Sequence, residues 1–300
     1  MVATRTAPSP FRAWLDRVRP TIDRALEEAA ASSSLGAAPD ELAAAVRHAL
    51  LSGGKRVRPA LALLACEAAG GPAEAALPAA VACEMVHSYS LVHDDLPCMD
   101  DDVLRRGRPT VHVLFGEGGA VLAGDALQAL AFEVLADQED AALVRDQVRI
   151  LAAAAGPAGM VGGQQLDLAA EGRPVGPEEV RAIHAAKTGA LLAAALRLGV
   201  RAAGRDPSAW EPYAQSLGLL FQATDDLLDA TGTTAELGKT AGKDAARAKP
   251  TLVSALGLEQ AAAAARELGR RARAALSRLD PVRHREILAD LPDFLLERCR

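Results

Sequence analysis

Two clusters of aspartates carry the residue types most suited to chemistry in this chain. The first follows an apolar stretch and consists of Asp94, Asp95, Asp100, Asp101 and Asp102. Carboxylates this close together repel one another, and a bound cation is the usual way to hold them. Because only 24% of the residues are charged, composition alone does not explain the cluster. We therefore interpret it as a cation site.

The second cluster, Asp225-Asp226-Leu227-Leu228-Asp229, has the simpler geometry. Asp225 and Asp229 are four residues apart, so they share one helix face and could ligate metal ions together, whereas Asp226 points about 100° away. Carboxylates without a neighbouring His or Cys favour Mg²⁺, with Mn²⁺ as an alternative. A solvated acidic helix end is the competing interpretation. We expect the two clusters to face each other across one cavity.

Ten basic residues lie beside Gly, Pro, Thr or Asp rather than in helix-surface pairs. They are Lys55, Arg56, Arg58, Arg105, Arg106, Arg108, Lys187, Lys239, Lys243 and Lys249. Arg gives bidentate contacts to phosphate, and Lys gives a mobile point charge. With the carboxylates, they indicate two diphosphate pockets, one built from metals and Lys and the other from Arg and Lys alone. The chain has no GxxxxGK[ST] phosphate loop and no GxSxG elbow.

An allylic diphosphate substrate would explain the absence of a protein nucleophile. Metal ions neutralise the leaving diphosphate, and the C–O bond breaks to give an allylic carbocation. The alkene of a second substrate attacks this cation, and the released diphosphate removes the final proton. The protein then supplies positive charge, orientation and a dry apolar tunnel.

Ala and Leu dominate the 300 residues and aromatic residues are only 3%, a composition that favours helices over strands. We therefore expect helices to position these groups. We predict one all-α domain over residues 1–300, a bundle of about ten or more helices around a deep central cavity. Its helices are expected at Phe11–Ala31, Asp40–Leu51, Ala60–Ala69, Leu77–Leu96, Glu117–Asp137, Ala142–Ala155, Pro177–Val200, Ala209–Ala230, Thr251–Leu279 and Val282–Glu297. Gly156–Gly163 is expected to be a break, and no β-hairpin is predicted.

The charge and cysteine patterns indicate a cytoplasmic protein. A net charge of −6 gives no reason to bind nucleic acid or an anionic membrane. The longest uncharged run, Ile150–Leu166, contains too many Gly and Pro residues to span a membrane, so we expect no integral membrane association. The N-terminus lacks the apolar core of a signal peptide. The cysteines show no zinc spacing and are expected to be mainly buried thiols in a reducing compartment: Cys66, Cys83, Cys98 and Cys299.

Several ordered motifs resemble one family over nearly the whole chain. They are Gly53–Pro59 (GGKRVRP), His93–Arg106 (HDDLPCMDDDVLRR), Gly159–Asp167 (GMVGGQQLD), Lys187-Thr188-Gly189, Phe221–Asp229 (FQATDDLLD) and Gly238–Asp244. In these motifs the chain resembles the trans-polyprenyl diphosphate synthases, most closely the bacterial-type farnesyl diphosphate synthases. The resemblance implies an isoprenoid-synthase-type fold, Mg²⁺ as cofactor, isoprenyl diphosphates as substrates and a homodimer.

The resemblance also implies roles for individual residues. The metal ligands would be Asp94, Asp100 and Asp225, with Asp95, Asp101 and Asp229 in support. The allylic diphosphate would contact Arg105, Lys187, Lys243 and Lys249, although the neighbourhood of Lys249 (AKPTL) departs from the usual pattern. Thr188 and Gln222 would shape the surroundings of the carbocation, and Asp226 is counted with the catalytic residues. Isopentenyl diphosphate would bind Gly54, Lys55, Arg58, His87 and Arg106.

Product length should follow the depth of the apolar tunnel. In the family, the fifth and fourth residues before the first Asp line this tunnel, and here they are Tyr89 and Ser90. Tyr89 resembles the aromatic stop of farnesyl-forming enzymes, and Met85 lies one turn deeper. Core packing is the alternative explanation for Tyr89. We predict a C15 product, with C20 as the alternative.

Two other functions share parts of this pattern. A class I terpene cyclase also ionises an allylic diphosphate with metal ions, but it needs no second diphosphate pocket. A non-catalytic subunit of a synthase heteromer is expected to have lost aspartates, whereas both clusters are complete here. Condensation of isopentenyl diphosphate with dimethylallyl or geranyl diphosphate, giving farnesyl diphosphate, is therefore the predicted reaction.

Overall fold

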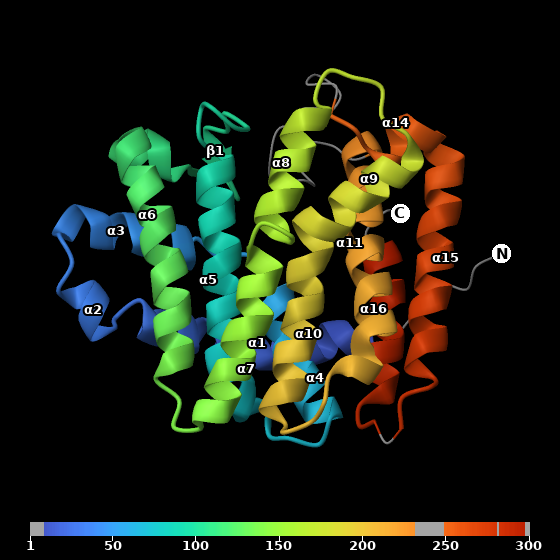
Figure 1. The fold of residues 1–300 in the computed structure, drawn as a ribbon, viewed down its shortest axis with the longest axis horizontal. Coiled ribbons are helices and arrows are strands. Elements are labelled where there is room, and N and C mark those ends of the chain that lie inside the picture. Colours follow the sequence, from blue (N-terminus) through green and yellow to red (C-terminus); the bar gives the residue numbers. More distant parts are fainter. Residues whose placement is uncertain (1–8, 232–248, 281, 298–300) are drawn as a thin grey trace.

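Helices that run side by side make up most of the structure (Figure 1). It is a computed structural model that describes residues 9–231, 249–280 and 282–297. The first half contains α1 (Pro10–Ala29), α2 (Ser33–Gly36), α3 (Asp40–Leu51), α4 (Val57–Ala68), η1 (Ala73–Ala76), α5 (Leu77–Asp94), β1 (Leu104–Arg105), β2 (Arg108–Pro109), α6 (Val111–Ala136) and α7 (Ala141–Ala155). The second half contains α8 (Met160–Ala170), α9 (Pro177–His184), η2 (Ala185–Gly189), α10 (Ala190–Ala202), η3 (Ser208–Trp210), α11 (Glu211–Thr231), α14 (Leu252–Leu256), α15 (Leu258–Leu276) and α16 (Arg285–Glu297).

Local sequence explains where several helices begin and end. Ser9 caps α1 by accepting the backbone N–H of Arg12, and a proline opens the helix. Thr251 and Ser254 form a reciprocal capping box at the start of α14. Gly257, with a φ of 80°, separates α14 from α15, a conformation that strains most other residues.

The predicted all-α class is confirmed, but three local predictions were wrong. Residues 160–170 form α8, so the helix includes Gly162 and Gly163, which were expected to break it. A short antiparallel pair, β1 with β2, follows the first aspartate cluster. The segment expected to be a single helix from Thr251 is divided into α14 and α15.

The apolar core surrounds α4, α5 and α10, which pack against one another. α6 lies against α5, and α15 lies against α11 on the other side of the bundle. α1 packs against α4, α5 and α16. The β1–β2 hairpin and the ends of α8, α9 and α14 lie at the upper end of the bundle in Figure 1.

Three helical stretches are long and apolar enough to cross a membrane by length and composition alone. They are Ala73–Asp94, Val111–Ala136 and Pro177–Ala202. The first and the third are 72% buried by the rest of the protein, which accounts for their apolar character. Only 39% of the second is buried, so α6 presents apolar side chains at the surface.

Candidate active site

A cavity of about 650 Å³ opens where α5, α8, α9 and α11 approach the loop before α4. Sixteen of the predicted site residues lie on its wall: Gly54, Lys55, Arg58, His87, Ser90, Asp94, Asp100, Arg105, Arg106, Lys187, Thr188, Gln222, Asp225, Asp226, Asp229 and Lys249. The two aspartate clusters therefore share one cavity, as the sequence predicted. Lys243 and its glycine-containing segment lie outside the described residues.

A tight turn shapes the first cluster. α5 ends at Asp94, and the backbone N–H of Asp100 donates back to the Asp94 carbonyl at 2.7 Å. The backbone N–H of Asp102 donates to the carbonyl of Asp95 at 3.1 Å. Asp101 takes a φ of 45° in this turn, a left-handed conformation that Asp tolerates better than most residues. The turn places Asp94 and Asp100 on the cavity wall together, although they are six residues apart.

Asp95 does not line this cavity. Its two carboxylate oxygens accept the Nε–H of Arg105 at 2.7 and 2.9 Å, and Nη2 of the same arginine lies 2.5 Å from Oδ1. Charge-assisted contacts of this kind fix both side chains. The geometry favours the supporting role expected for Asp95, which holds Arg105 at the edge of the cavity.

Asp94 has surroundings that favour a bound cation. Burial, opposed by the charge of Lys187 and aided by that of Asp100, raises the pKa of its carboxyl to about 6. The side-chain amide of Gln164 donates to one of its oxygens. A buried carboxylate of raised pKa gains more from a neighbouring cation than a solvated one does.

The second cluster divides between two environments. Asp225 and Asp229 lie one turn apart on α11 and both line the cavity. Asp226 is buried, and its Oδ2 accepts the backbone N–H of Leu252 at 2.7 Å and lies 3.4 Å from Nε2 of His184. Asp226, which was predicted to be catalytic, also lines the cavity, and these contacts brace α11 against α14 there.

Asp226 also orients the pair predicted to surround the carbocation. Its Oδ1 accepts the amide N–H of Gln222 at 3.1 Å, so the Gln222 amide oxygen faces the other way. That oxygen accepts the hydroxyl of Thr188 at 2.7 Å. Thr188 belongs to η2, a single π-helical turn, and such turns occur frequently at functional sites. One chain of hydrogen bonds thus fixes both polar side chains on the cavity wall.

Two lysines on the wall are paired with carboxylates. Nζ of Lys187 lies 2.5 Å from Oδ2 of Asp167, and Nζ of Lys249 lies 2.6 Å from Oδ1 of Asp100. Although burial opposes the charged form of Lys187, Asp94 and Asp167 raise its pKa. The ammonium group therefore stays charged at neutral pH.

Gln164 and Asp167 both line the cavity, although no individual role was predicted for either. The sequence signal for them is the preceding Gly162-Gly163 pair, which allows close helix packing instead of breaking the helix. A Cβ atom at position 163 would lie 2.1 Å from the backbone nitrogen of Lys187. Glycine therefore lets α8 approach η2 closely enough for Asp167 to pair with Lys187.

Cations from two further segments also line the cavity. The guanidinium of Arg58 lies 5.9 Å from the centre of the Phe221 ring, and its buried Nε has no hydrogen-bond partner among the described residues. Burial, with the charges of Arg58 and Arg106, lowers the pKa of His87 well below its usual value, so this imidazole is neutral at pH 7. A Cβ at Gly54 would lie 2.7 Å from Cζ of Arg106, so glycine makes room for the guanidinium.

The predicted chain-length residues lie at different depths. Ser90 lines the cavity, whereas Tyr89 and Met85 are buried and are not among its lining residues. The Tyr89 ring contacts His93 edge-on at 5.9 Å, and its buried hydroxyl lies near Gln128 without a hydrogen bond of normal geometry. Burial raises the pKa of Tyr89 to about 12.

The carboxylates fit Mg²⁺ that is shared with a substrate. Within residues 9–231, 249–280 and 282–297, no three acidic, His or Cys side chains are gathered into a ready-made metal site. Mg²⁺ commonly takes one or two protein carboxylates and completes its shell with water and phosphate oxygens. Asp94 and Asp100 on one side, and Asp225 and Asp229 on the other, provide such partial sets.

A family model described as Polyprenyl synthetase matches residues 39–281. The chain belongs to the polyprenyl synthetase family. It is 47% identical over 263 residues to the farnesyl diphosphate synthase of Escherichia coli, covering 84% of this chain and 88% of that protein. It is 43% identical over 286 residues to the chloroplastic geranylgeranyl pyrophosphate synthase of Catharanthus roseus, covering 93% and 79%.

Solved structures of polyprenyl synthetases share the fold. A geranyltransferase from Helicobacter pylori, complexed with magnesium and isoprenyl diphosphate, superposes with a TM-score of 0.81 at 32% identity and covers 98% of each chain. The isoprenoid-synthase-type fold predicted from the sequence is therefore confirmed. As a polyprenyl synthetase, the chain is a prenyltransferase that joins prenyl units head to tail.

Proposed function

We propose that this polyprenyl synthetase condenses isopentenyl diphosphate with dimethylallyl or geranyl diphosphate and releases farnesyl diphosphate, C15, as its main product. One observation carries the proposal: both aspartate clusters and both sets of cations line a single cavity. Geranylgeranyl diphosphate, C20, is the alternative product, because the relatives include synthases of both lengths.

The carboxylate side of the cavity is suited to the allylic diphosphate. Asp94, Asp100, Asp225 and Asp229 would hold Mg²⁺, or Mn²⁺ in its place, with Asp95 behind them. The bound metal would neutralise charge on the leaving diphosphate. Arg105, Lys187 and Lys249 stand beside these carboxylates and would contact the same diphosphate, together with Lys243.

The basic side is suited to isopentenyl diphosphate, which needs no metal there. Gly54 leaves room for Arg106, and Lys55 and Arg58 add charge on the same wall. Neutral His87 can donate a hydrogen bond to a phosphate oxygen. These groups would hold the alkene of one substrate against the allylic carbon of the other.

The reaction would follow ionisation, condensation and elimination. The allylic C–O bond breaks, and the electron pair leaves with the diphosphate. The double bond of isopentenyl diphosphate then forms the new C–C bond. The departed diphosphate removes a proton and restores a double bond. Thr188 and Gln222 present oxygen atoms to the cationic stage and are held in place by Asp226.

The two competing functions have less support. A terpene cyclase has no use for the wall formed by Lys55, Arg58, His87 and Arg106. A non-catalytic subunit is disfavoured because both aspartate clusters reach the cavity. We propose that the purified chain is active by itself.

We also propose a homodimer in which α6 is the contact surface. Val113, Leu114, Val121 and Leu122 are 42 to 58% exposed on this helix. An apolar helix face of this size is typical of a protein interface. We propose a cytoplasmic location without integral membrane association, since burial within the bundle or against a second copy accounts for the apolar helices.

A diphosphate-release assay tests this proposal. With Mg²⁺, the wild-type chain should release diphosphate only when isopentenyl diphosphate and an allylic diphosphate are both present. Release from the allylic substrate alone would favour a cyclase. Inactivity that only a second protein restores would favour a subunit.

A further inference from the structure

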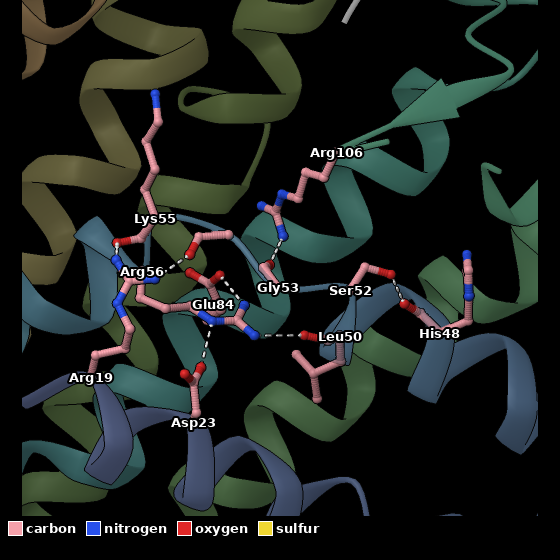
Figure 2. Close-up of polar contacts among 11 residues, drawn as sticks. Arg19, Asp23, His48, Leu50, Ser52, Gly53, Lys55, Arg56, Glu84 and Arg106 are labelled. Atoms are coloured by element: carbon pink, nitrogen blue, oxygen red, sulfur yellow. Dashed lines mark hydrogen bonds and ion pairs between the residues drawn. The ribbon is translucent and has the colours of Figure 1, made fainter. Parts of the chain in front are cut away.

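In the segment Gly53–Arg58, the side chain of Arg56 is held by carboxylates of the protein. Lys55 extends away from the loop, whereas the guanidinium of Arg56 lies among Asp23, Glu84 and Leu50 (Figure 2). The Arg56 side chain is only 3% exposed, although it belongs to the most basic stretch of the cavity wall. Its charge is therefore paired with carboxylates of the protein and is not presented to a substrate.

All three guanidinium nitrogens of Arg56 are engaged. Nε donates to Asp23 at 2.9 Å, Nη1 donates to Glu84 at 2.7 Å, and Nη2 donates to the Leu50 carbonyl at 3.2 Å. The Glu84 side chain is also 3% exposed, whereas that of Asp23 is 42% exposed. One side chain thus joins α1, α3 and α5 to the start of α4.

The backbone around Arg56 has an unfavourable conformation that must be held by contacts. Gly53 and Gly54 have φ values of 78° and 136°, and Arg56 itself has a φ of 50°. A left-handed conformation is unfavourable for Arg and persists only where the surroundings impose it. The three side-chain contacts of Arg56 supply that constraint.

A second clamp comes from α1. Nη1 of Arg19 donates to the carbonyl of Gly54 at 3.0 Å, and Nη2 lies 3.5 Å from the carbonyl of Lys55. Arg19 and Asp23 are four residues apart, so one face of α1 holds both the backbone and Arg56. This helix precedes residue 39, where the family match begins.

Glu84 connects the loop to the rest of the basic wall. It lies three residues before His87 on α5, hence on the same side of the helix. The Arg56–Glu84 pair therefore sets the spacing between His87 on α5 and the two cations that flank Arg56, Lys55 and Arg58. These three groups are among those assigned above to isopentenyl diphosphate.

We infer that Arg56, braced by Glu84 and by Asp23 of α1, is the positioning residue of the isopentenyl diphosphate subsite. It touches no substrate. It fixes the loop so that Lys55, Arg58 and His87 converge on one diphosphate. This inference rests on the proposed function and assigns a structural basis to one of its two subsites.

Steady-state kinetics with each substrate varied in turn tests the inference. Arg56→Lys keeps the charge but cannot reach three partners in the geometry of a guanidinium. We expect KM for isopentenyl diphosphate to rise about tenfold or more, since small misplacements of binding groups have effects of this size. KM for the allylic diphosphate should change by less than about twofold, because its subsite is built from other elements.

Asp23→Asn is the second variant, because Asp23 is half-exposed and its loss should leave the protein folded. We expect KM for isopentenyl diphosphate to rise about threefold, in line with a partly exposed ion pair, with an unchanged Tm. Asp16→Asn is the matched control: Asp16 pairs with Arg12 on the same helix, at the surface, and both KM values should stay at the wild-type level.

The outcomes separate the two proposals. Wild-type protein that never consumes isopentenyl diphosphate would refute the proposed function. Active wild type, with folded variants whose two KM values rise equally or not at all, would refute the positioning role. If Arg56→Lys fails to fold, the KM values of Asp23→Asn decide the question.

Discussion

The Oδ2 atom of Asp226 accepts the backbone N–H of Leu252 at 2.7 Å, across 26 residues of sequence. Asp225 and Asp226 both line the cavity, and Asp226 also accepts this hydrogen bond from another helix. We therefore expect the two adjacent aspartates to perform different tasks. Asp225 would hold metal, whereas Asp226 joins α11 to the segment that carries Lys249, two residues before the capping residue Thr251.

This division predicts opposite effects for two alanine variants. Asp225→Ala should raise the Mg²⁺ concentration needed for half-maximal activity by about tenfold or more while stability is kept. Asp226→Ala should leave the Mg²⁺ requirement within about twofold but lower the free energy of unfolding by about 1–3 kcal/mol, because the Leu252 N–H loses its acceptor. Mg²⁺ titrations and urea unfolding measure the two effects.

Exposed Asp137, at the end of α6, offers the control for both variants. Asp137→Ala should match the wild type in each assay. An equal rise in Mg²⁺ requirement for Asp225→Ala and Asp226→Ala would contradict the division of roles.

Tyr89 gives the prediction on product length. Tyr89→Ala removes a buried aromatic ring next in sequence to the cavity residue Ser90, and the space it leaves should admit at least one further isoprene unit. We expect the main product to shift from C15 to C20 or longer in chromatography of the dephosphorylated alcohols. Tyr89→Phe keeps the ring and should keep the C15 product. Unchanged length in Tyr89→Ala would show that Tyr89 serves only core packing.

The sequence predicted the chemistry better than it predicted the local structure. Residue types and spacing were enough to bring Asp94, Asp225 and Lys187 to one site, because helical periodicity places them on inward faces. They did not show that Asp95 pairs with Arg105, since this depends on the turn between Asp94 and Asp102. Glycines at 162 and 163 were misleading because glycine disfavours helices, but here close packing requires it.

The buried ion pairs could not be predicted from the sequence either. Arg56 stood among ten basic residues of similar context, and no local pattern distinguished it from Arg58. Only the fold shows that Glu84 and Asp23, which are 28 and 33 residues away, meet its guanidinium. Long-range contacts of this kind follow from helix packing, which the sequence of one segment does not encode.

The cysteines provide a test of burial. Burial raises the pKa of Cys66 to about 11 and that of Cys83 to about 12, so both stay protonated at pH 8, whereas Cys98 is exposed. The expectation that the thiols are mainly buried thus fails for Cys98, and Cys299 lies outside the described residues.

Iodoacetamide at pH 8, followed by peptide mapping, should modify Cys98 first and leave Cys66 and Cys83 unmodified until urea unfolds the protein. Early modification of Cys83 would contradict the packing of α5 against α10.

The exposed face of α6 predicts the oligomeric state. Wild-type protein should elute in light-scattering chromatography at twice the mass of one chain. Leu122→Lys places a charge on this face, where Leu122 is 58% exposed, and should shift the protein to the monomer. Leu258→Lys, at a 48% exposed position of α15, is the control that should stay dimeric. A monomeric wild type, or a dimeric Leu122→Lys, would contradict the assigned surface.

Product chromatography tests the central claim most directly. The purified wild-type chain is incubated with Mg²⁺, dimethylallyl diphosphate and an excess of isopentenyl diphosphate, and the products are dephosphorylated and separated by length. We expect farnesol as the main alcohol, and its formation should stop when either substrate or Mg²⁺ is removed. Mainly geranylgeraniol would contradict the assigned length, and no chain growth that depends on isopentenyl diphosphate would contradict the two-pocket reaction itself.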